Sequence, residues 1–210
     1  MKKIKIGYIS PVNDIANQQF DAAMRDIKPN LIDIVNWKEY DYVPEAVFKI
    51  AYTDDAILLR YAVKEKYIRA NYLFPNDPVY KDSCVEFFIS FDGKKYYNFE
   101  FNCIGTTLAS YGNSNKETRM RLSAALIDTI QTNSKIQCQR LNSSWELSVK
   151  IPINIFNETG IKSLKGIEAT ANFYKCGDDL PLPHFLSWNE INHPSPNFHL
   201  PAFFGEIVFD

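Results

Sequence analysis

The sequence lacks the motifs of the commonest enzyme and membrane-protein classes. Its 210 residues contain no apolar run near the ~20 residues that a membrane-spanning helix requires. No G-x-S-x-G elbow, P-loop or G-x-G-x-x-G fingerprint occurs, so acyl transfer, nucleotide chemistry and dinucleotide binding have no support. The first segment, MKKIKIGYISPVND, starts like a signal peptide but has no apolar core. We therefore expect a soluble protein that is cytoplasmic as the sequence is written, and secreted or periplasmic if an export signal has been trimmed.

A strong net charge is also missing. The formal net charge is −2 at pH 7, and the basic clusters are no longer than pairs of lysines. A protein that binds nucleic acid or an anionic membrane surface usually carries a larger basic footprint. We therefore expect neither nucleic acid nor membrane as a partner, and we expect a monomer.

Spacings typical of metal sites are absent. The four cysteines show no C-x-x-C pattern, and the three histidines are nine and six residues apart, wider than zinc pairs usually are. No D-x-D-x-D-G ladder is present, although loop carboxylates such as Asp54 and Asp178 leave structural calcium open. We expect no metal site and no cofactor. A disulfide between Cys84 and Cys103 is conceivable, but buried free thiols are favoured.

Short strand-like runs dominate what is present. Hydrophobic residues make up 46% of the chain and aromatic residues 14%, which indicates a core rich in rings. Strands are expected at residues 46–53, 56–63, 66–73, 85–91, 96–103, 106–111, 135–141, 145–151, 166–176 and 206–209. The regularly interposed helices of βαβ units are missing, so the pattern predicts an all-β, antiparallel β-sandwich of immunoglobulin-like type. Short helices are expected at 17–27 and 116–130. We expect one domain over residues 1–210, with residues 1–36 as an N-terminal extension packed on the sandwich.

The segment from residue 80 to residue 111 predicts a β-hairpin with two different faces. Apolar side chains alternate with polar ones in both runs, so one face is apolar and the other carries acids, amides and rings. A three-residue loop at 93–95 would pair Asp92 with Tyr96 and place Glu86 opposite Asn102. The polar face suits a polyhydroxylated ligand, but the spacing alone favours an ordinary solvated sheet surface. A proline-rich loop at 180–204 either lines a site or covers a sheet edge.

Three segments together resemble a known family. The order DSCVEFFI, then YYNFEFNCIGT, then NFHLPAFFGEIVF resembles the family 9 carbohydrate-binding modules and their relatives with the DOMON-type β-sandwich, from about Trp37 to the C-terminus. The resemblance implies non-catalytic binding of a mono- or oligosaccharide on a sheet face, in the service of polysaccharide catabolism. Glu86 matches the carboxylate of the motif, and Tyr80 stands where members of the family have a stacking tryptophan. Trp188 is the natural second ring.

The expected ligand-binding residues are therefore the rings and polar groups near this face. They are Tyr80, Glu86, Asn98, Glu100, Asn102, Arg119, Arg121 and Trp188. Stacking on one ring contributes about 2 kcal/mol and each of two or three hydrogen bonds about 1 kcal/mol, and the sum corresponds to roughly millimolar affinity. Each residue also has a structural alternative: Glu86 could pair with either arginine, and Trp188 could belong to the core.

Two other functions stay open. Glu86 and Glu100 share one face, so they could form the carboxyl pair of a glycoside hydrolase. An open sheet, however, offers no means of raising the pKa of one of them. A haem or another flat apolar ligand is the third class, because some DOMON-type domains bind haem; it would need an axial pair such as Met120 and a loop histidine.

Overall fold

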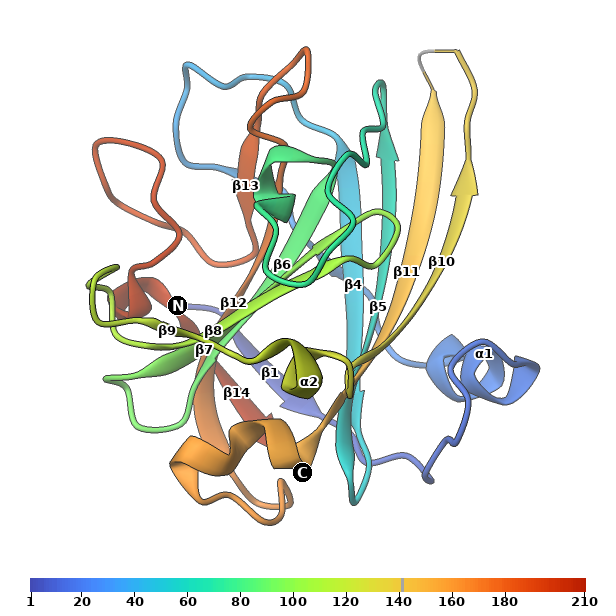
Figure 1. The fold of residues 1–210 in the computed structure, drawn as a ribbon, viewed down its shortest axis with the longest axis vertical. Helices are drawn as coiled ribbons and strands as arrows, with labels where there is room; N and C mark the ends of the chain where they lie inside the picture. The colour runs from blue at the N-terminus through green and yellow to red at the C-terminus, as the bar shows by residue number, and fades with distance from the viewer. Residues whose placement is uncertain (141) are drawn as a thin grey trace.

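Two sheets packed face to face form the protein in the computed structural model, which describes residues 1–140 and 142–210 (Figure 1). The strands of the first sheet run in the order β1 (Lys3–Ile6), β14 (Gly205–Phe209), β12 (Glu168–Cys176), β6 (Cys84–Ser90), β7 (Tyr96–Asn102), β8 (Thr107–Gly112) and β9 (Met120–Arg121). The short strand β13 (Phe185–Ser187) pairs with β12 and with β3 (Ile34–Val35). The second sheet runs in the order β10 (Gln131–Gln137), β11 (Ser143–Pro152), β5 (Ala56–Glu65), β4 (Glu45–Tyr52) and β2 (Asn30–Leu31).

Helices are short in the described part of the chain. There are two α-helices, α1 (Gln18–Arg25) and α2 (Ala124–Ile127), and three 3-10 segments, η1 (Val79–Lys81), η2 (Ile153–Thr159) and η3 (Pro201–Phe203). The strand pairs are antiparallel except for the pair of β1 with β14. The predicted all-β antiparallel sandwich with one or two short α-helices is therefore confirmed. None of the described helices has the length and apolarity to cross a bilayer.

The main core lies between the two sheets and consists of the alternate residues that face inward. Val85, Phe87 and Ile89 of β6 are fully buried there, as their period of two predicts. The ring of Phe48 from the second sheet stacks on Phe173 of the first, with centroids 3.6 Å apart. Contact of this kind between strands of both sheets holds the polar face of β6 and β7 on the outer side of the sandwich.

The register of the β6–β7 hairpin differs from the expected one by two residues. Glu86 lies opposite Glu100, not opposite Asn102. The loop is longer than predicted because Asp92 leaves the ladder and its Oδ1 accepts the backbone N–H groups of Lys94 and Lys95, both at 2.8 Å. The shift brings two carboxyl groups side by side on one face.

Two other predicted elements were wrong. Residues 66–73 form a loop, not a strand, because the carboxylate of Asp82 accepts the N–H groups of Asn71 and Tyr72 that a neighbouring strand would otherwise bind. The helix expected at 116–130 is confined to α2, since Leu122 donates its N–H to Ala109 and so continues the sheet pairing past β9. The strand expected at 135–141 begins and ends earlier, as β10 (Gln131–Gln137), and residue 141 lies outside the described residues.

The N-terminal residues and the tryptophans are part of this packing. β1 extends the first sheet, and α1 covers the outer face of the second sheet with Phe20 and Met24 buried. Trp37, Trp145 and Trp188 are each no more than 3% exposed. The ring of Trp188, one of the expected ligand platforms, lies in the core between the sheets.

Candidate functional site

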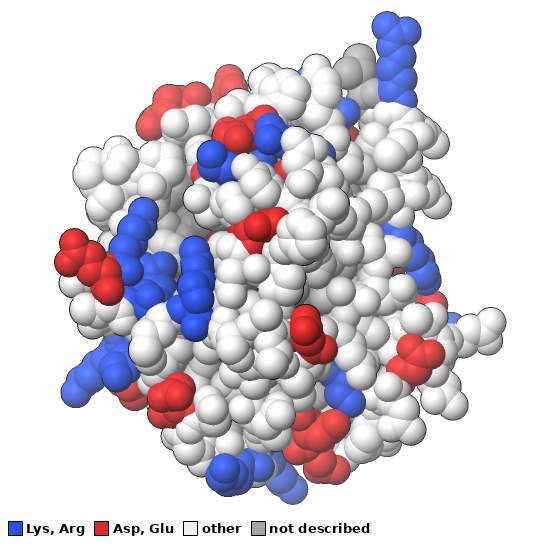
Figure 2. All heavy atoms as spheres, viewed as in Figure 1, with Lys and Arg blue, Asp and Glu red and all other residues white. Residues whose placement is uncertain are grey.

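A cavity of about 540 Å³ opens on the outer face of the first sheet. It lies over β12, β6, β7, β8 and β9, and its walls come from η1 and from the proline-rich segment 180–204. Its volume is in the range of sites for small molecules. Figure 2 shows the hollow, with acidic atoms near its centre and lysine and arginine side chains over the β8–β9 region.

The floor of the cavity holds the two opposed carboxyl groups. Glu86 and Glu100 both line it, yet they are only 3% and 4% exposed. An open, solvated sheet face was expected, and this expectation was wrong. The rings of Phe198 and Phe204 and their neighbours pack onto the same face of the sheet, so the segment 180–204 turns it into a walled pocket.

Burial changes the acidity of the carboxyl groups. Desolvation, helped by the adjacent Cys176 thiol and by Glu100, raises the pKa of Glu86 well above its usual range. Desolvation also raises the pKa of Glu100 to about 7, against the opposing effects of Arg121 and the Asn98 amide. The pKa of Asp178 beside them rises to about 6, chiefly through burial. Glu86 and most of Glu100 are therefore protonated just below neutral pH, whereas Asp178 is protonated only as the pH falls through about 6.

Arginine side chains form the wall above β8 and β9. Arg121 donates from Nη1 to the Ser110 hydroxyl at 2.8 Å. Nη1 of Arg119 lies 2.7 Å from Nδ1 of His199, and its guanidinium lies over the Tyr96 ring at 5.7 Å from the centroid. Burial and the neighbouring Arg119 lower the pKa of His199 to about 3, so the imidazole is neutral and can accept from Arg119 and Tyr96. Both arginines of the expected set thus line the cavity, and neither pairs with Glu86.

Aromatic rings line the entrance. Tyr80, half-buried in the middle of η1, lines the cavity as one of the expected rings. Trp188 does not line it; its ring packs 5.6 Å from Phe173 inside the sandwich. The rings of Phe185 and Phe198 lie in the cavity wall instead. Sequence reasoning missed these two phenylalanines, and the only signal for them was their place in the long proline-rich segment.

The two asparagines of the expected set lie beside the cavity, not in its lining. Asn98 donates from Nδ2 to Oε1 of Glu100 at 3.0 Å and so orients that carboxyl. Asn102 donates to the Tyr72 carbonyl and to Asp82, and its Oδ1 accepts the N–H of Thr106. The three bonds of Asn102 hold the loops at the end of β7. In place of the asparagines, the lining includes Lys116, Asp178 and His199, none of which was among the expected residues.

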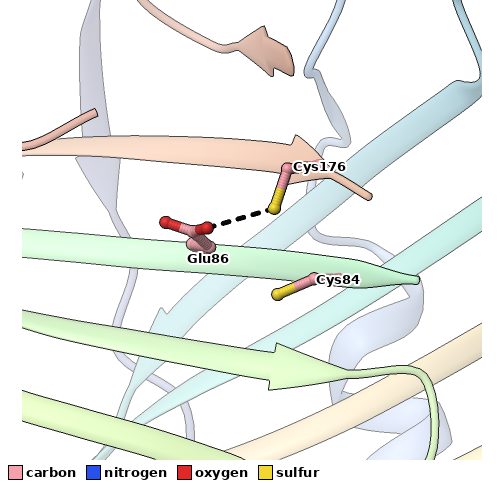
Figure 3. A group of neighbouring side chains, drawn as sticks. All are labelled: Cys84, Glu86 and Cys176. Atoms are coloured by element: carbon pink, nitrogen blue, oxygen red, sulfur yellow. Dashed lines mark hydrogen bonds between the residues drawn. The ribbon is translucent and has the colours of Figure 1, made fainter. Parts of the chain in front are cut away.

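One group of side chains in the described chain has atoms close enough to share a metal ion. One ligand atom each of Cys84, Glu86 and Cys176 lies within 4.8 Å of the others, all buried (Figure 3). Two sulfurs and a carboxylate suit a soft cation such as Zn²⁺. In the structure the Cys176 thiol donates to Oε1 of Glu86 at 3.2 Å, and burial raises the pKa of Cys84 to about 12. The three groups are therefore neutral, and their protons would have to leave before a metal could bind.

The cysteines and the loop carboxylates have other partners. All four cysteines are free thiols, and Cys84 lies opposite Cys176, not opposite Cys103. Of the carboxylates considered for calcium, Asp54 accepts from the Tyr8 hydroxyl at 3.0 Å and Asp178 lines the cavity.

Comparison with known proteins agrees with this geometry. The model of carbohydrate-binding family 9 matches residues 18–209. A search of curated protein sequences gives no match to the chain. A solved structure from Bacteroides uniformis, described as a candidate carbohydrate-binding protein, is 38% identical, with a TM-score of 0.90 over 100% of this chain and 99% of that one.

Two structures of a family 9 module from Caldicellulosiruptor kristjanssonii share the fold. The complex with glucose has a TM-score of 0.68 at 17% identity and covers 100% of this chain and 96% of that one. The complex with cellotriose has a TM-score of 0.65 at 17% identity, over 99% and 93%. Since the family model spans nearly the whole sandwich, the chain belongs to carbohydrate-binding family 9, a family of non-catalytic carbohydrate-binding modules.

Proposed function

We propose that the cavity on the first sheet binds a mono- or oligosaccharide, with the sugar ring lying against Tyr80 and Phe185. The observation that carries this proposal is the combination of half-buried aromatic rings with acids and arginines around one hollow. A sugar presents C–H faces for stacking and hydroxyl groups for hydrogen bonds. The neighbouring family 9 module that is bound to glucose and to cellotriose supports the same class of ligand.

The buried floor suits the hydroxyl groups of a sugar. A protonated carboxyl donates one hydrogen bond and accepts others, so Glu86 and Glu100 can serve both the hydrogen and the oxygen of a hydroxyl group. Oε2 of Glu100 has no hydrogen-bond partner among the described residues, although it is buried. A ligand hydroxyl would satisfy this atom, which otherwise carries the cost of desolvation.

We propose further that the sugar is bound without being cleaved. A glycosidase needs one protonated carboxyl group and one ionised carboxylate, so the two must have clearly different pKa values. In this cavity burial raises the pKa of both Glu86 and Glu100. At pH 6 both groups are mainly protonated, so neither serves there as the ionised partner. The expected result with aryl glycosides at pH 6 is therefore no release of the aryl group above the uncatalysed rate.

The binding test is isothermal titration calorimetry with hexoses and short oligosaccharides. We expect dissociation constants near the millimolar range, and Tyr80→Ala should weaken binding by about 2 kcal/mol, or roughly 30-fold, through loss of stacking area. Tyr8→Ala is the matched control, because Tyr8 is 47% exposed and contacts Tyr52 and Asp54, outside the cavity lining. Calorimetry is preferable to tryptophan quenching, since none of the three tryptophans lines the cavity.

The proposal fails if no sugar in such a panel binds at tens of millimolar. It also fails if Tyr80→Ala and Tyr8→Ala bind sugar equally well while both remain folded by circular dichroism.

A further inference from the structure

Three cationic side chains line one wall of the cavity, and all come from the segment that joins β8 to β9 and from β9 itself. They are Lys116, Arg119 and Arg121. The carboxyl groups of the cavity lie elsewhere, on the floor and in the loop that follows β12. The charges in the lining are therefore separated, with positive charge gathered on one side. Figure 2 shows this group of basic side chains beside the hollow.

None of these three cations forms an ion pair within the described part of the chain. Arg121 donates to the Ser110 hydroxyl, and Arg119 donates to neutral His199 and to backbone carbonyls of its own turn. Neutral partners fix the position of a guanidinium without neutralising it. Its charge and its remaining N–H groups stay available to a ligand.

The acids on the floor do not cancel this charge near neutral pH. The pKa of Glu100 is raised to about 7 and that of Asp178 to about 6, both mainly by burial, and the pKa of Glu86 is raised further. Just below pH 7 the lining therefore carries more positive than negative charge.

We propose that the cavity selects sugars that bear a carboxylate, that is hexuronates, with the carboxylate bound by Arg119 and Arg121 and the ring against Tyr80. This inference rests on the proposed sugar-binding function. The planar, forked guanidinium matches a carboxylate in two parallel hydrogen bonds. A sugar phosphate can form the same paired bonds with a guanidinium, so it is the competing anionic sugar in the test.

The test compares galacturonate and glucuronate with galactose, glucose and glucose 6-phosphate by calorimetry at pH 6.5 and low salt. The uronates should bind at least about ten-fold more tightly than the matching hexoses, as a charge-assisted hydrogen bond predicts. Arg121→Gln and Arg119→Gln should each lower the uronate affinity roughly ten-fold more than they lower the hexose affinity. Arg25→Gln is the control: it removes the same charge from the exposed Arg25 of α1, which packs on the other sheet.

Each other outcome has a distinct meaning. Equal affinity for uronates and hexoses, or equal loss of both in Arg121→Gln, overturns the inference and leaves sugar binding intact. An equal effect of Arg25→Gln shows that net charge alone acts, and also overturns it. Tighter binding of glucose 6-phosphate than of glucuronate rejects the carboxylate. Failure of every sugar to bind overturns the proposed function, and this inference with it.

Discussion

At the scale of single residues, Glu100 combines burial with an incomplete set of hydrogen bonds. Its Oε1 accepts from Asn98 at 3.0 Å, while its Oε2 has no partner in the described chain. Because the pKa in the folded protein, about 7, lies above the unfolded value near 4.5, folding favours the protonated form. The stability that Glu100 contributes is fully present below about pH 4.5 and is lost as the pH rises through 7.

Glu100→Gln should therefore change the pH dependence of stability. The amide keeps the bond from Asn98 and cannot ionise. The difference in unfolding free energy between the variant and the wild type should therefore grow in favour of the variant by up to about 3 kcal/mol from pH 4.5 to pH 8. Urea denaturation at the two pH values measures this difference. Glu117→Gln changes an exposed carboxyl and serves as the control. Parallel pH profiles for Glu100→Gln and the wild type would contradict the expectation.

At the scale of elements, the position of the last strand depends on a close contact between its first residue and a tryptophan ring. β14 begins at Gly205, where an added Cβ would lie 2.5 Å from Cζ3 of Trp188 and 2.8 Å from the Lys2 carbonyl oxygen. The missing side chain lets β14 pass against the indole while it pairs with β1 and β12. This contact fixes Trp188 in the core and thereby keeps it out of the ligand site.

Gly205→Ala should lower the unfolding free energy by about 1–3 kcal/mol, because the methyl group must displace the indole or the strand. A shift of tryptophan emission should accompany the loss. Gly7→Ala is the matched control, since a Cβ at Gly7 meets nothing within 4 Å. Equal stability of the two variants would show that the strand adjusts without cost.

At the scale of the whole molecule, a buried ion pair joins the two sheets. Lys175 of β12 lies 3.0 Å from Oε2 of Glu65 at the end of β5, and neither side chain is exposed. The ammonium group directs its hydrogen bonds to the Cys176 carbonyl and to His184, while Trp145 donates to the other oxygen of Glu65 at 2.6 Å. Charge, more than a hydrogen bond, thus holds the pair together, and desolvation offsets much of its attraction.

Removing one partner should cost far more than removing both. Lys175→Met leaves the Glu65 carboxylate buried without a cation and should lower stability by about 3–5 kcal/mol, whereas the double variant Lys175→Met with Glu65→Leu should recover most of the loss. Lys64→Met breaks the exposed pair with Glu45 and should cost at most about 1 kcal/mol. Urea denaturation of the single and double variants measures the coupling. Additive losses would mean that the pair is not coupled.

Local patterns were sufficient for much of the fold. The alternation in β6, β7 and β11 predicted which side chains enter the core, because neighbouring residues of a strand must point to opposite faces. The register of the hairpin was missed, since it depends on the hydrogen bonds that Asp92 makes inside the loop. The strand predicted at 66–73 was wrong for a similar reason, because the side chain of Asp82 binds the backbone of this segment.

The candidate site was predicted in part. Tyr80, Glu86, Glu100 and both arginines do line one cavity. The period of the strands placed the two glutamates on one face, and the resemblance to the family indicated the tyrosine. Phe185 and Phe198 could not be predicted in this way. They lie in a largely irregular segment, where no strand or helix period indicates the direction of a side chain.

By itself, the sequence determined the class of sandwich, the inward face of its strands and the family, because these depend on patterns within short segments. Only the tertiary structure decided that the polar face is a walled cavity and not an open surface. That outcome depends on how the segment 180–204 folds back across β6 and β12. Packing between segments that are far apart in the sequence produces no periodic sequence pattern, so it could not be predicted. The burial that follows is what raises the pKa of the floor carboxyls and leaves the positive wall uncompensated.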